Sequence, residues 1–290
     1  MSAHDKNARL DRLLAGEGPV VAPGVADALG ARLVEVSGFD AVYMSGFAVA
    51  GSLAKPDVGV LSMKEVLDRA AQIADSVAIP LLVDVDDGYG NAVNVVRTVR
   101  EFERAGVSGL QLEDQRTPKR CGVLAGKTLI TRREMVGKIK ACTDTRRDHN
   151  LKVIARTDAI GLEGLDRAIE RSIAYRDAGA DLLMFSGPNG EEDVSKILEA
   201  VRHPLAYINA DPAPNRPAIA VPRLGLLGVK LVVFPLTILF SAARAALNVL
   251  AEIKKVGSTD HLPGAFVSWE QYHDIVGLPE VRRIEATYGG

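Results

Sequence analysis

Apolar residues gather in eight short runs along the chain, each three to six residues long. The runs are rich in Val, Ile and Leu and do not alternate with polar residues, which is typical of strands buried on both faces of a parallel sheet. The pattern predicts strands at residues 20–22, 41–45, 81–84, 109–113, 152–157, 181–185, 205–209 and 230–234.

Segments with helical spacing separate these runs. The clearest predicted helices cover residues 63–77, 93–105, 132–146, 165–178 and 193–201. Gly106 and Gly179 follow two of them, where a helix C-cap favours glycine. Regular alternation of strand and helix favours a closed (β/α)8 barrel over an open doubly wound sheet.

Two segments are longer than a barrel requires. Residues 115–131 follow the fourth strand, are polar, and form the kind of long loop that covers an active site. Residues 259–290 follow the eighth helix and hold the only Trp, Trp269, among other apolar residues. That apolar side must pack on the barrel itself or on a neighbouring subunit. We expect one domain over residues 1–290, with 259–290 as a C-terminal helical extension.

Composition favours a small ligand. The 290 residues are 47% hydrophobic, and the 35 Lys and Arg nearly balance 37 Asp and Glu, so nothing indicates a nucleic acid or an anionic membrane as partner. The two cysteines, Cys121 and Cys142, suit a reducing compartment. Residues 231–240 and 242–251, the longest apolar segments, are interrupted by Ser241 and Arg244 and are too short to span a bilayer. We expect a cytoplasmic protein.

In a (β/α)8 barrel the carboxyl ends of the strands meet at one mouth. The polar and small residues there are Tyr43, Ser45, Gly46, Asp84, Asp86, Asp87, Glu113, Asp114, Arg156, Thr157, Asp158, Ser186, Gly187, Asn209 and Asp211. Several carboxylates without histidine suit Mg2+ or Mn2+, and Mg2+ takes only one or two of them directly. Alternatively, some of these acids cap helices or pair with Arg156. The pattern around Asp57 indicates no more than a turn.

The string Lys119-Arg120-Cys121-Gly122 lies inside the long loop. Two adjacent cations would lower the pKa of the thiol, which favours a reactive thiolate or a proton donor that works near neutral pH. A solvated basic loop is the alternative. Cys142, in contrast, lies in a predicted helix and has an ordinary packing explanation.

Five strings together identify a resemblance: YMSG from Tyr43, DVDDGYGN from Asp84, LEDQ from Leu112, PKRCG from Pro118 and IARTD from Ile154. From about residue 19 onward the chain resembles the isocitrate lyase/phosphoenolpyruvate mutase superfamily, and within it the branch of methylisocitrate and 2,3-dimethylmalate lyases.

The resemblance implies a (β/α)8 barrel that binds Mg2+, or Mn2+, through Asp84 and Asp86, with Asp57 and Glu113 acting through waters. It implies substrate-binding roles for Tyr43, Ser45, Gly46, Gly122, Arg156 and Asn209. Among these, Ser45, Gly46 and Arg156 match positions that hold the carboxylate of a 2-oxo acid. It further implies homotetramers, built as dimers of dimers, that exchange their C-terminal helices.

The loop with Cys121 implies the carbon–carbon lyase branch, in which Cys121 protonates the departing carbanion, with Lys119 and Arg120 as further catalytic residues beside it. We therefore expect a Mg2+-dependent lyase that cleaves a 2-hydroxy dicarboxylate of the substituted-malate type into pyruvate or glyoxylate and a second acid. The alternatives are an oxaloacetate decarboxylase, a phosphonate or phosphoenolpyruvate mutase, and a barrel that binds a 2-oxo acid without turnover.

The chain departs from the pattern on one side of the expected pocket. Val123 stands where lyases of citrate-like acids have His, Ser186 where Glu is usual, and Phe47 where a small residue is common. Residues 235–240 lack an Arg often found there. Because burying an unmatched carboxylate costs several kcal/mol, we expect a second fragment that is smaller or less polar than succinate, and we disfavour isocitrate and methylisocitrate as substrates.

Overall fold

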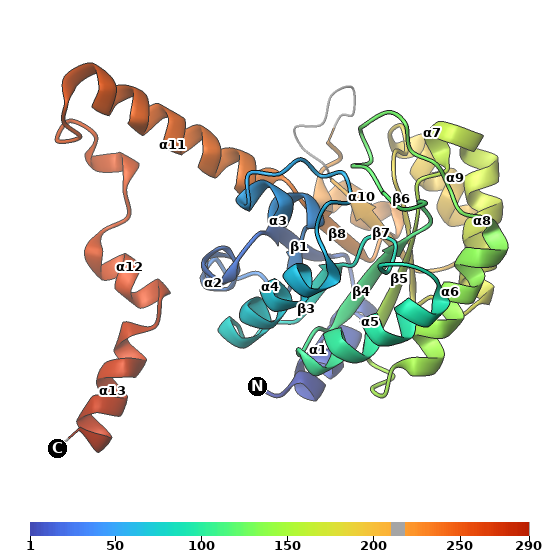
Figure 1. Ribbon diagram of the computed structural model, residues 1–290, viewed down its shortest axis with the longest axis horizontal. Helices are drawn as coiled ribbons and strands as arrows, with labels where there is room; N and C mark the ends of the chain where they lie inside the picture. Colours follow the sequence, from blue (N-terminus) through green and yellow to red (C-terminus); the bar gives the residue numbers. More distant parts are fainter. Residues whose placement is uncertain (210–217, 290) are drawn as a thin grey trace.

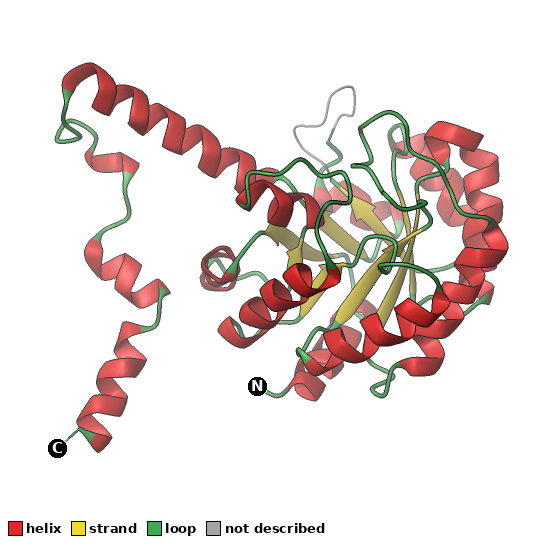
Figure 2. Cartoon of the chain, viewed as in Figure 1, coloured by secondary structure: helices red, strands yellow, loops and turns green. Residues whose placement is uncertain are grey.

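The computed structural model describes residues 1–209 and 218–289. Its eight parallel strands close into a barrel in sequence order, with β8 paired to β1. The strands are β1 (Val20–Val25), β2 (Val42–Met44), β3 (Leu81–Asp84), β4 (Gly109–Glu113), β5 (Lys152–Thr157), β6 (Leu182–Phe185), β7 (Leu205–Ile208) and β8 (Leu231–Phe234). Helices surround this sheet (Figure 2). The predicted (β/α)8 barrel is confirmed.

The helices of the barrel region are α1 (Ala3–Ala15), α2 (Ala28–Val36), α3 (Gly46–Ser52), α4 (Met63–Ser76), α5 (Ala92–Arg104), α6 (Arg132–Thr145), α7 (Ile160–Glu163), α8 (Leu165–Asp177), α9 (Glu191–Val201) and α10 (Val221–Leu227). Capping boxes fix the start of four of them, α1, α4, α5 and α6, for example Ser62 with Glu65 before α4. Before α6 the box is formed by Thr131 with Glu134. This box ends the long loop at residue 131, as the sequence predicts.

The first strand is longer than its apolar run. β1 continues through Pro23 and Gly24 to Val25, because Pro23 pairs with Phe234 and Gly24 pairs with Tyr43 of the neighbouring strands. Only glycine fits at position 24, since a Cβ there would lie 2.5 Å from Pro235 Cα. Pairing with both neighbours therefore extends β1 beyond the part that hydrophobicity alone indicates.

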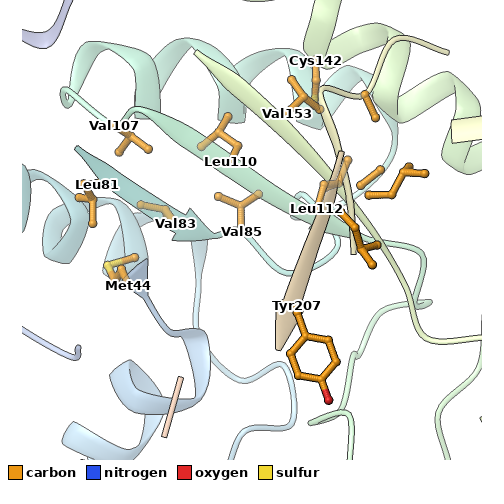
Figure 3. Close-up of a cluster of buried hydrophobic side chains, with 14 of the residues drawn as sticks. Met44, Leu81, Val83, Val85, Val107, Leu110, Leu112, Cys142, Val153 and Tyr207 are labelled. Atoms are coloured by element: carbon orange, nitrogen blue, oxygen red, sulfur yellow. The ribbon is translucent and has the colours of Figure 1, made fainter. Parts of the chain in front are cut away.

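Side chains of successive strand residues pack in two separate cores. Leu81 and Val83 face outward and pack with Met44 and Leu110 beneath the helices (Figure 3). Leu82, between them, faces the barrel interior. The interior cluster also contains Leu10 of α1, which is fully buried. Helix α1 thus closes the end of the barrel opposite the mouth, and the period-two alternation explains why both faces of each strand are apolar.

The C-terminal region leaves the barrel. Helix α11 (Thr237–Val256) points away from it and leads to α12 (Trp269–Ile275) and α13 (Leu278–Tyr288) (Figure 1). Arg32 Nε of α2 donates a hydrogen bond to the carbonyl of Ile275 at 3.0 Å, which ties α12 to the barrel's side. Most apolar side chains of this region stay exposed, Trp269 to 76% and Tyr288 to 83%. Within the described chain, no helix is long and apolar enough to cross a membrane.

Candidate active site

A small cavity of about 70 Å³ lies at the mouth of the barrel. Its polar lining residues outside the long loop are Tyr43, Ser45, Asp57, Asp84, Arg156 and Ser186. Residues 119–123 of the long loop also line it, and its apolar lining residues are Phe47, Ile208, Val233, Pro235 and Leu236. Residues from eight separated segments therefore meet around one space, as expected for the carboxyl ends of barrel strands.

Asp84 and Asp86 direct their carboxylates toward the same gap. Asp84 ends β3, and Asp86 follows with a φ of 50°, a left-handed conformation uncommon for residues other than glycine. A Cβ built on Gly46 would lie 3.1 Å from Asp86 Oδ1 and 3.2 Å from Asp84 Oδ2. These two oxygens face the backbone of Gly46, the first residue of α3. The gap between them exists because residue 46 has no side chain.

Lys119 of the loop is buried against these acids. Its Nζ lies 2.5 Å from Asp57 Oδ1 and 2.7 Å from Asp86 Oδ1. Burial raises the pKa of Asp86 to about 7, with Asp84 adding to the rise and Lys119 opposing it. Burial lowers the pKa of Lys119, but Asp86, Asp84 and Glu113 outweigh it and raise that pKa well above its ordinary value. The acids of this site thus favour a cation among them.

Arg156 of β5 forms the second charged centre. Its guanidinium lies 3.1 Å from Glu113 Oε2 and 2.9 Å from Asp158 Oδ2. Burial, with Asp158 adding to its effect, raises the pKa of Glu113 well above its ordinary range, and Arg156 only partly offsets this. Glu113 Oε1 is buried and, within the described residues, has no hydrogen-bond partner. It is an acceptor that a water or a ligand can satisfy.

The donor set fits a hard divalent cation. Two carboxylate oxygens converge on the gap beside Gly46, which matches the one or two carboxylates that Mg2+ takes directly. Across residues 1–209 and 218–289, no three Asp, Glu, His or Cys side chains group closely enough to ligate one ion together. A cation at this gap would complete its coordination with waters or substrate oxygens.

The structure corrects the expectation for the thiol. Burial raises the pKa of Cys121, and the nearby cations Arg156 and Lys119 offset only part of that rise. Arg120, the adjacent cation, is largely exposed, and its Nη1 donates instead to the carbonyl of Ala125 at 3.3 Å. The prediction of a lowered thiol pKa is therefore wrong, because desolvation outweighs the charges. The raised pKa favours the protonated form of the Cys121 thiol at neutral pH.

The loop is held closed by contacts made by its backbone. The N–H of Cys121 donates to the carbonyl of Asp57 at 3.0 Å. Lys127 Nζ donates to the carbonyl of Gly122 and lies 3.7 Å from Asp158 Oδ1. Gly122 packs so tightly that a Cβ there would lie 2.6 Å from Ser186 Oγ. Glycine at 122 therefore allows the loop to seat directly on the ends of β5 and β6.

Residues 10–254 match the family model of phosphoenolpyruvate phosphomutase. The chain belongs to the phosphoenolpyruvate mutase/isocitrate lyase superfamily. It is 40% identical over 282 residues to 2,3-dimethylmalate lyase of Eubacterium barkeri, covering 97% of each protein. It is 39% identical to 2-methylisocitrate lyase of Aeropyrum pernix, covering 92% of this chain and 86% of that protein. A solved structure of phosphonopyruvate hydrolase in complex with oxalate and Mg2+ has a TM-score of 0.88 at 31% identity over the full length of both chains.

The other predicted site residues, Ser45, Asn209 and Asp211, have different positions relative to the cavity. Ser45 Oγ accepts a hydrogen bond from Ala48 N at 3.3 Å and caps α3, and Ser45 also borders the cavity. Asn209 is buried at the end of β7, where its Nδ2 donates to the carbonyl of Ile219 at 3.0 Å. Asp211 lies outside the described residues.

Three of the predicted mouth residues, Asp87, Asp114 and Thr157, do not border the cavity. Asp114 accepts hydrogen bonds from Thr157 Oγ1 and Tyr175 OH, each at 2.8 Å. Lys138 Nζ donates to the carbonyl of Asp87 at 2.7 Å. The alternative that some mouth acids pair with Arg156 is borne out by Glu113 and Asp158.

Sequence reasoning missed two residues near the site. Gln111 is fully buried and donates to Asp84, and Lys127 holds the closed loop. Gln111 did give a signal, because it is a polar residue inside the apolar run of β4 and shares the facing of Glu113 two positions later. Lys127 gave none, since its contact with Asp158 of another segment appears only in the folded barrel.

Proposed function

We propose that this protein is a Mg2+-dependent carbon–carbon lyase that cleaves a 2-hydroxy dicarboxylate into a 2-oxo acid, pyruvate or glyoxylate, and a second carboxylic acid. The observation that carries the proposal is one cavity bordered by Asp84, Arg156 and Cys121 under a closed loop, with the carboxylate of Asp86 facing the gap beside Asp84. A cation position, a carboxylate-binding guanidinium and a proton donor are the three groups that this reaction needs.

Asp84 and Asp86 would hold Mg2+, with Asp57 and Glu113 acting through waters. When bound, the cation would supply Lewis-acid stabilisation for the oxygen of the 2-hydroxyl group as it becomes a carbonyl oxygen. Supporting this assignment, the gap beside Gly46 faces two carboxylate oxygens, and a structurally similar hydrolase was solved with Mg2+. Mn2+ fits the same oxygen ligands.

Arg156 and the backbone at Gly46 would bind the carboxylate of the forming 2-oxo acid, with Ser45 and Tyr43 beside it. The guanidinium is well suited because it is buried and rigidly held by Glu113 and Asp158. Gly122 and Asn209 are further proposed substrate-binding positions.

Cys121 would donate the proton. As the C2–C3 bond breaks, its electron pair stays on C3 and the hydroxyl oxygen on C2 becomes a carbonyl oxygen, losing its proton. The hydroxyl proton passes to solvent water, the thiol protonates C3, and the resulting thiolate takes one proton back from water, so no co-reactant is consumed. The raised pKa of Cys121 supports this role, because the residue carries a proton at neutral pH. Lys119 and Arg120 would position the thiol and its loop.

The apolar side of the cavity supports an alkyl-substituted malate as substrate. Phe47 packs edge-on against Phe240, with ring centroids 5.8 Å apart, and Leu236 lies beside them in the wall. Val123 occupies the rim. Such a wall stabilises methyl groups and gives no partner to a second carboxylate. The 40% identical relative is named for the cleavage of 2,3-dimethylmalate, a substrate of this kind.

The exposed C-terminal helices support a homotetramer, built as a dimer of dimers, in which α12 and α13 exchange between subunits. Leu250, Ile253 and Trp269 are between 43% and 76% exposed, and burying such side chains is the usual reason for association. The expectations of a cytoplasmic location and of one domain over residues 1–290 stay predictions.

An assay coupled to lactate dehydrogenase tests the function. It would follow pyruvate or glyoxylate release, with Mg2+ and with EDTA, from 2,3-dimethylmalate, citramalate, 2-methylisocitrate, isocitrate and oxaloacetate. Mg2+-dependent turnover of a substituted malate is the expected result. Turnover of oxaloacetate alone would favour the decarboxylase instead. Val123 and Ser186 keep this alternative open, because they stand where the related lyases have His and Glu.

A further inference from the structure

A buried chain of hydrogen bonds links Tyr43 to Asp84 through Gln111. Tyr43 OH donates to Gln111 Oε1 at 2.7 Å, and Gln111 Nε2 donates to Asp84 Oδ1 at 3.0 Å. All three residues are at most 6% exposed. They come from the adjacent strands β2, β3 and β4, so the barrel itself sets their spacing.

The direction of this chain is fixed by chemistry. An ionised carboxylate can only accept hydrogen bonds, so the amide nitrogen of Gln111, and not its oxygen, must face Asp84. The amide oxygen then faces Tyr43 and receives the phenol proton. Each member has one arrangement that satisfies the others, and the network has no alternative orientation of equal energy.

The network also assigns the two oxygens of Asp84 to different tasks. Oδ1 accepts from Gln111 Nε2 and from the backbone N–H of Asp86 at 3.1 Å. Oδ2 is the atom that faces the gap beside Gly46. With Oδ1 occupied by two donors, rotation of the carboxylate would break both hydrogen bonds, so Oδ2 stays directed at the gap.

We propose that Gln111 is a positioning residue for the metal centre: it orients Asp84 so that Oδ2 is presented to the cation, and it is itself oriented by Tyr43. The inference rests on the proposed metal-dependent function. It assigns no contact between Gln111 and substrate or metal. Its effect should therefore appear in metal affinity, because groups that orient a metal ligand typically contribute about 10- to 100-fold to that affinity.

The test is titration of the whole protein with Mn2+, followed by the electron paramagnetic resonance signal of the free aqueous ion. Gln111→Met keeps the side-chain length and removes both hydrogen bonds. We expect its Mn2+ dissociation constant to rise about tenfold or more. The matched control is Gln115→Met, because Gln115 is equally buried but bonds only the backbone of Arg120. That variant should bind Mn2+ as the wild type does.

The outcomes separate the two hypotheses. Wild-type protein that fails to bind Mn2+ would overturn the proposed metal-dependent function and this inference with it. Wild-type binding that Gln111→Met leaves unchanged would overturn the positioning role alone. A comparable loss in both glutamine variants would also overturn it, since the effect would then be general destabilisation, checked by thermal melts.

A second variant covers the case in which Gln111→Met does not fold. Tyr43→Phe keeps the ring and removes only the hydroxyl that orients the Gln111 amide. Because Tyr43 OH donates to Gln111 and not to Asp84, we expect its effect on the metal to pass through Gln111. We expect about a two- to tenfold weaker Mn2+ affinity, the equivalent of one hydrogen bond. An unchanged affinity would contradict the proposed role of the Tyr43–Gln111–Asp84 hydrogen bonds.

Discussion

Lys119 and Asp86 form a buried ion pair, with Nζ 2.7 Å from Oδ1, although the two residues come from different parts of the barrel. Lys119 lies in the loop after β4, and Asp86 follows β3. The pair therefore joins the cover of the cavity to the acids at its floor. Closing of the loop and the charge of the site are coupled, because the ammonium neutralises carboxylates only while the loop is seated.

Lys119→Met should destabilise the protein strongly. Removing the cation leaves Asp57 and Asp86 buried without their partner, and breaking such a pair typically costs about 3–5 kcal/mol. Urea unfolding without added metal measures the loss. The control is Lys64→Met, because Lys64 pairs with Asp68 on the surface and such pairs contribute about 1 kcal/mol or less. Equal losses in the two variants would show that the buried Lys119 ion pairs stabilise the protein no more than an exposed pair does.

Cys121→Ser should lower carbon–carbon cleavage by roughly 10²- to 10⁴-fold while leaving Mg2+ binding unchanged. A hydroxyl fits the space of the thiol but is a much weaker acid. The coupled assay gives the rate, and Mn2+ titration gives the metal affinity. Cys142→Ala is the control, because Cys142 lies on the buried face of α6 and does not border the cavity, so its replacement should leave turnover unchanged. Wild-type rates in Cys121→Ser would remove Cys121 as the proton donor.

Cys142 should make stability fall at alkaline pH. Burial raises its pKa from 9.0 to about 12 in the folded protein. Above pH 9 the unfolded chain loses this proton and the folded protein keeps it, so the free energy of unfolding decreases as pH rises toward 12. The slope from one such group is at most about 1.4 kcal/mol per pH unit. Urea unfolding at pH 8 and 10 should show a smaller decrease in Cys142→Ala, and identical decreases would contradict the assignment.

The sequence predicts those features that are determined by residues close together in the chain. The strand at 81–84 and the gathering of Asp84, Asp86 and Arg156 follow from hydrophobic runs and from the geometry of any parallel barrel, and both were found. The pKa of Cys121 was predicted with the wrong sign, because adjacent cations are visible in a string and desolvation is not. Burial depends on residues far away in the chain.

The same reasoning explains why the surface that covers residues 259–290 and the role of Gln111 could not be predicted. The apolar residues of 259–290 indicate that this segment must be covered, but not by which surface, since that depends on assembly. Gln111 acquires its role only when β3 and β4 pair with Asp84 beside it. A single polar residue in a strand indicates a buried partner without naming it.

Val123→His should shift the substrate preference toward a second carboxylate. Val123 borders the cavity on the covering loop, and an imidazole there can donate a hydrogen bond to a carboxylate that valine leaves unmatched. Because a hydrogen bond to a charged group is worth about 1.5–3 kcal/mol, kcat/KM for 2-methylisocitrate relative to 2,3-dimethylmalate should rise roughly 10- to 100-fold. The matched control is Leu124→His, since the neighbouring Leu124 is similarly exposed but does not border the cavity. An unchanged ratio in Val123→His would mean that the loop does not set the identity of the second fragment, and would move that role to the wall formed by Phe47 and Leu236.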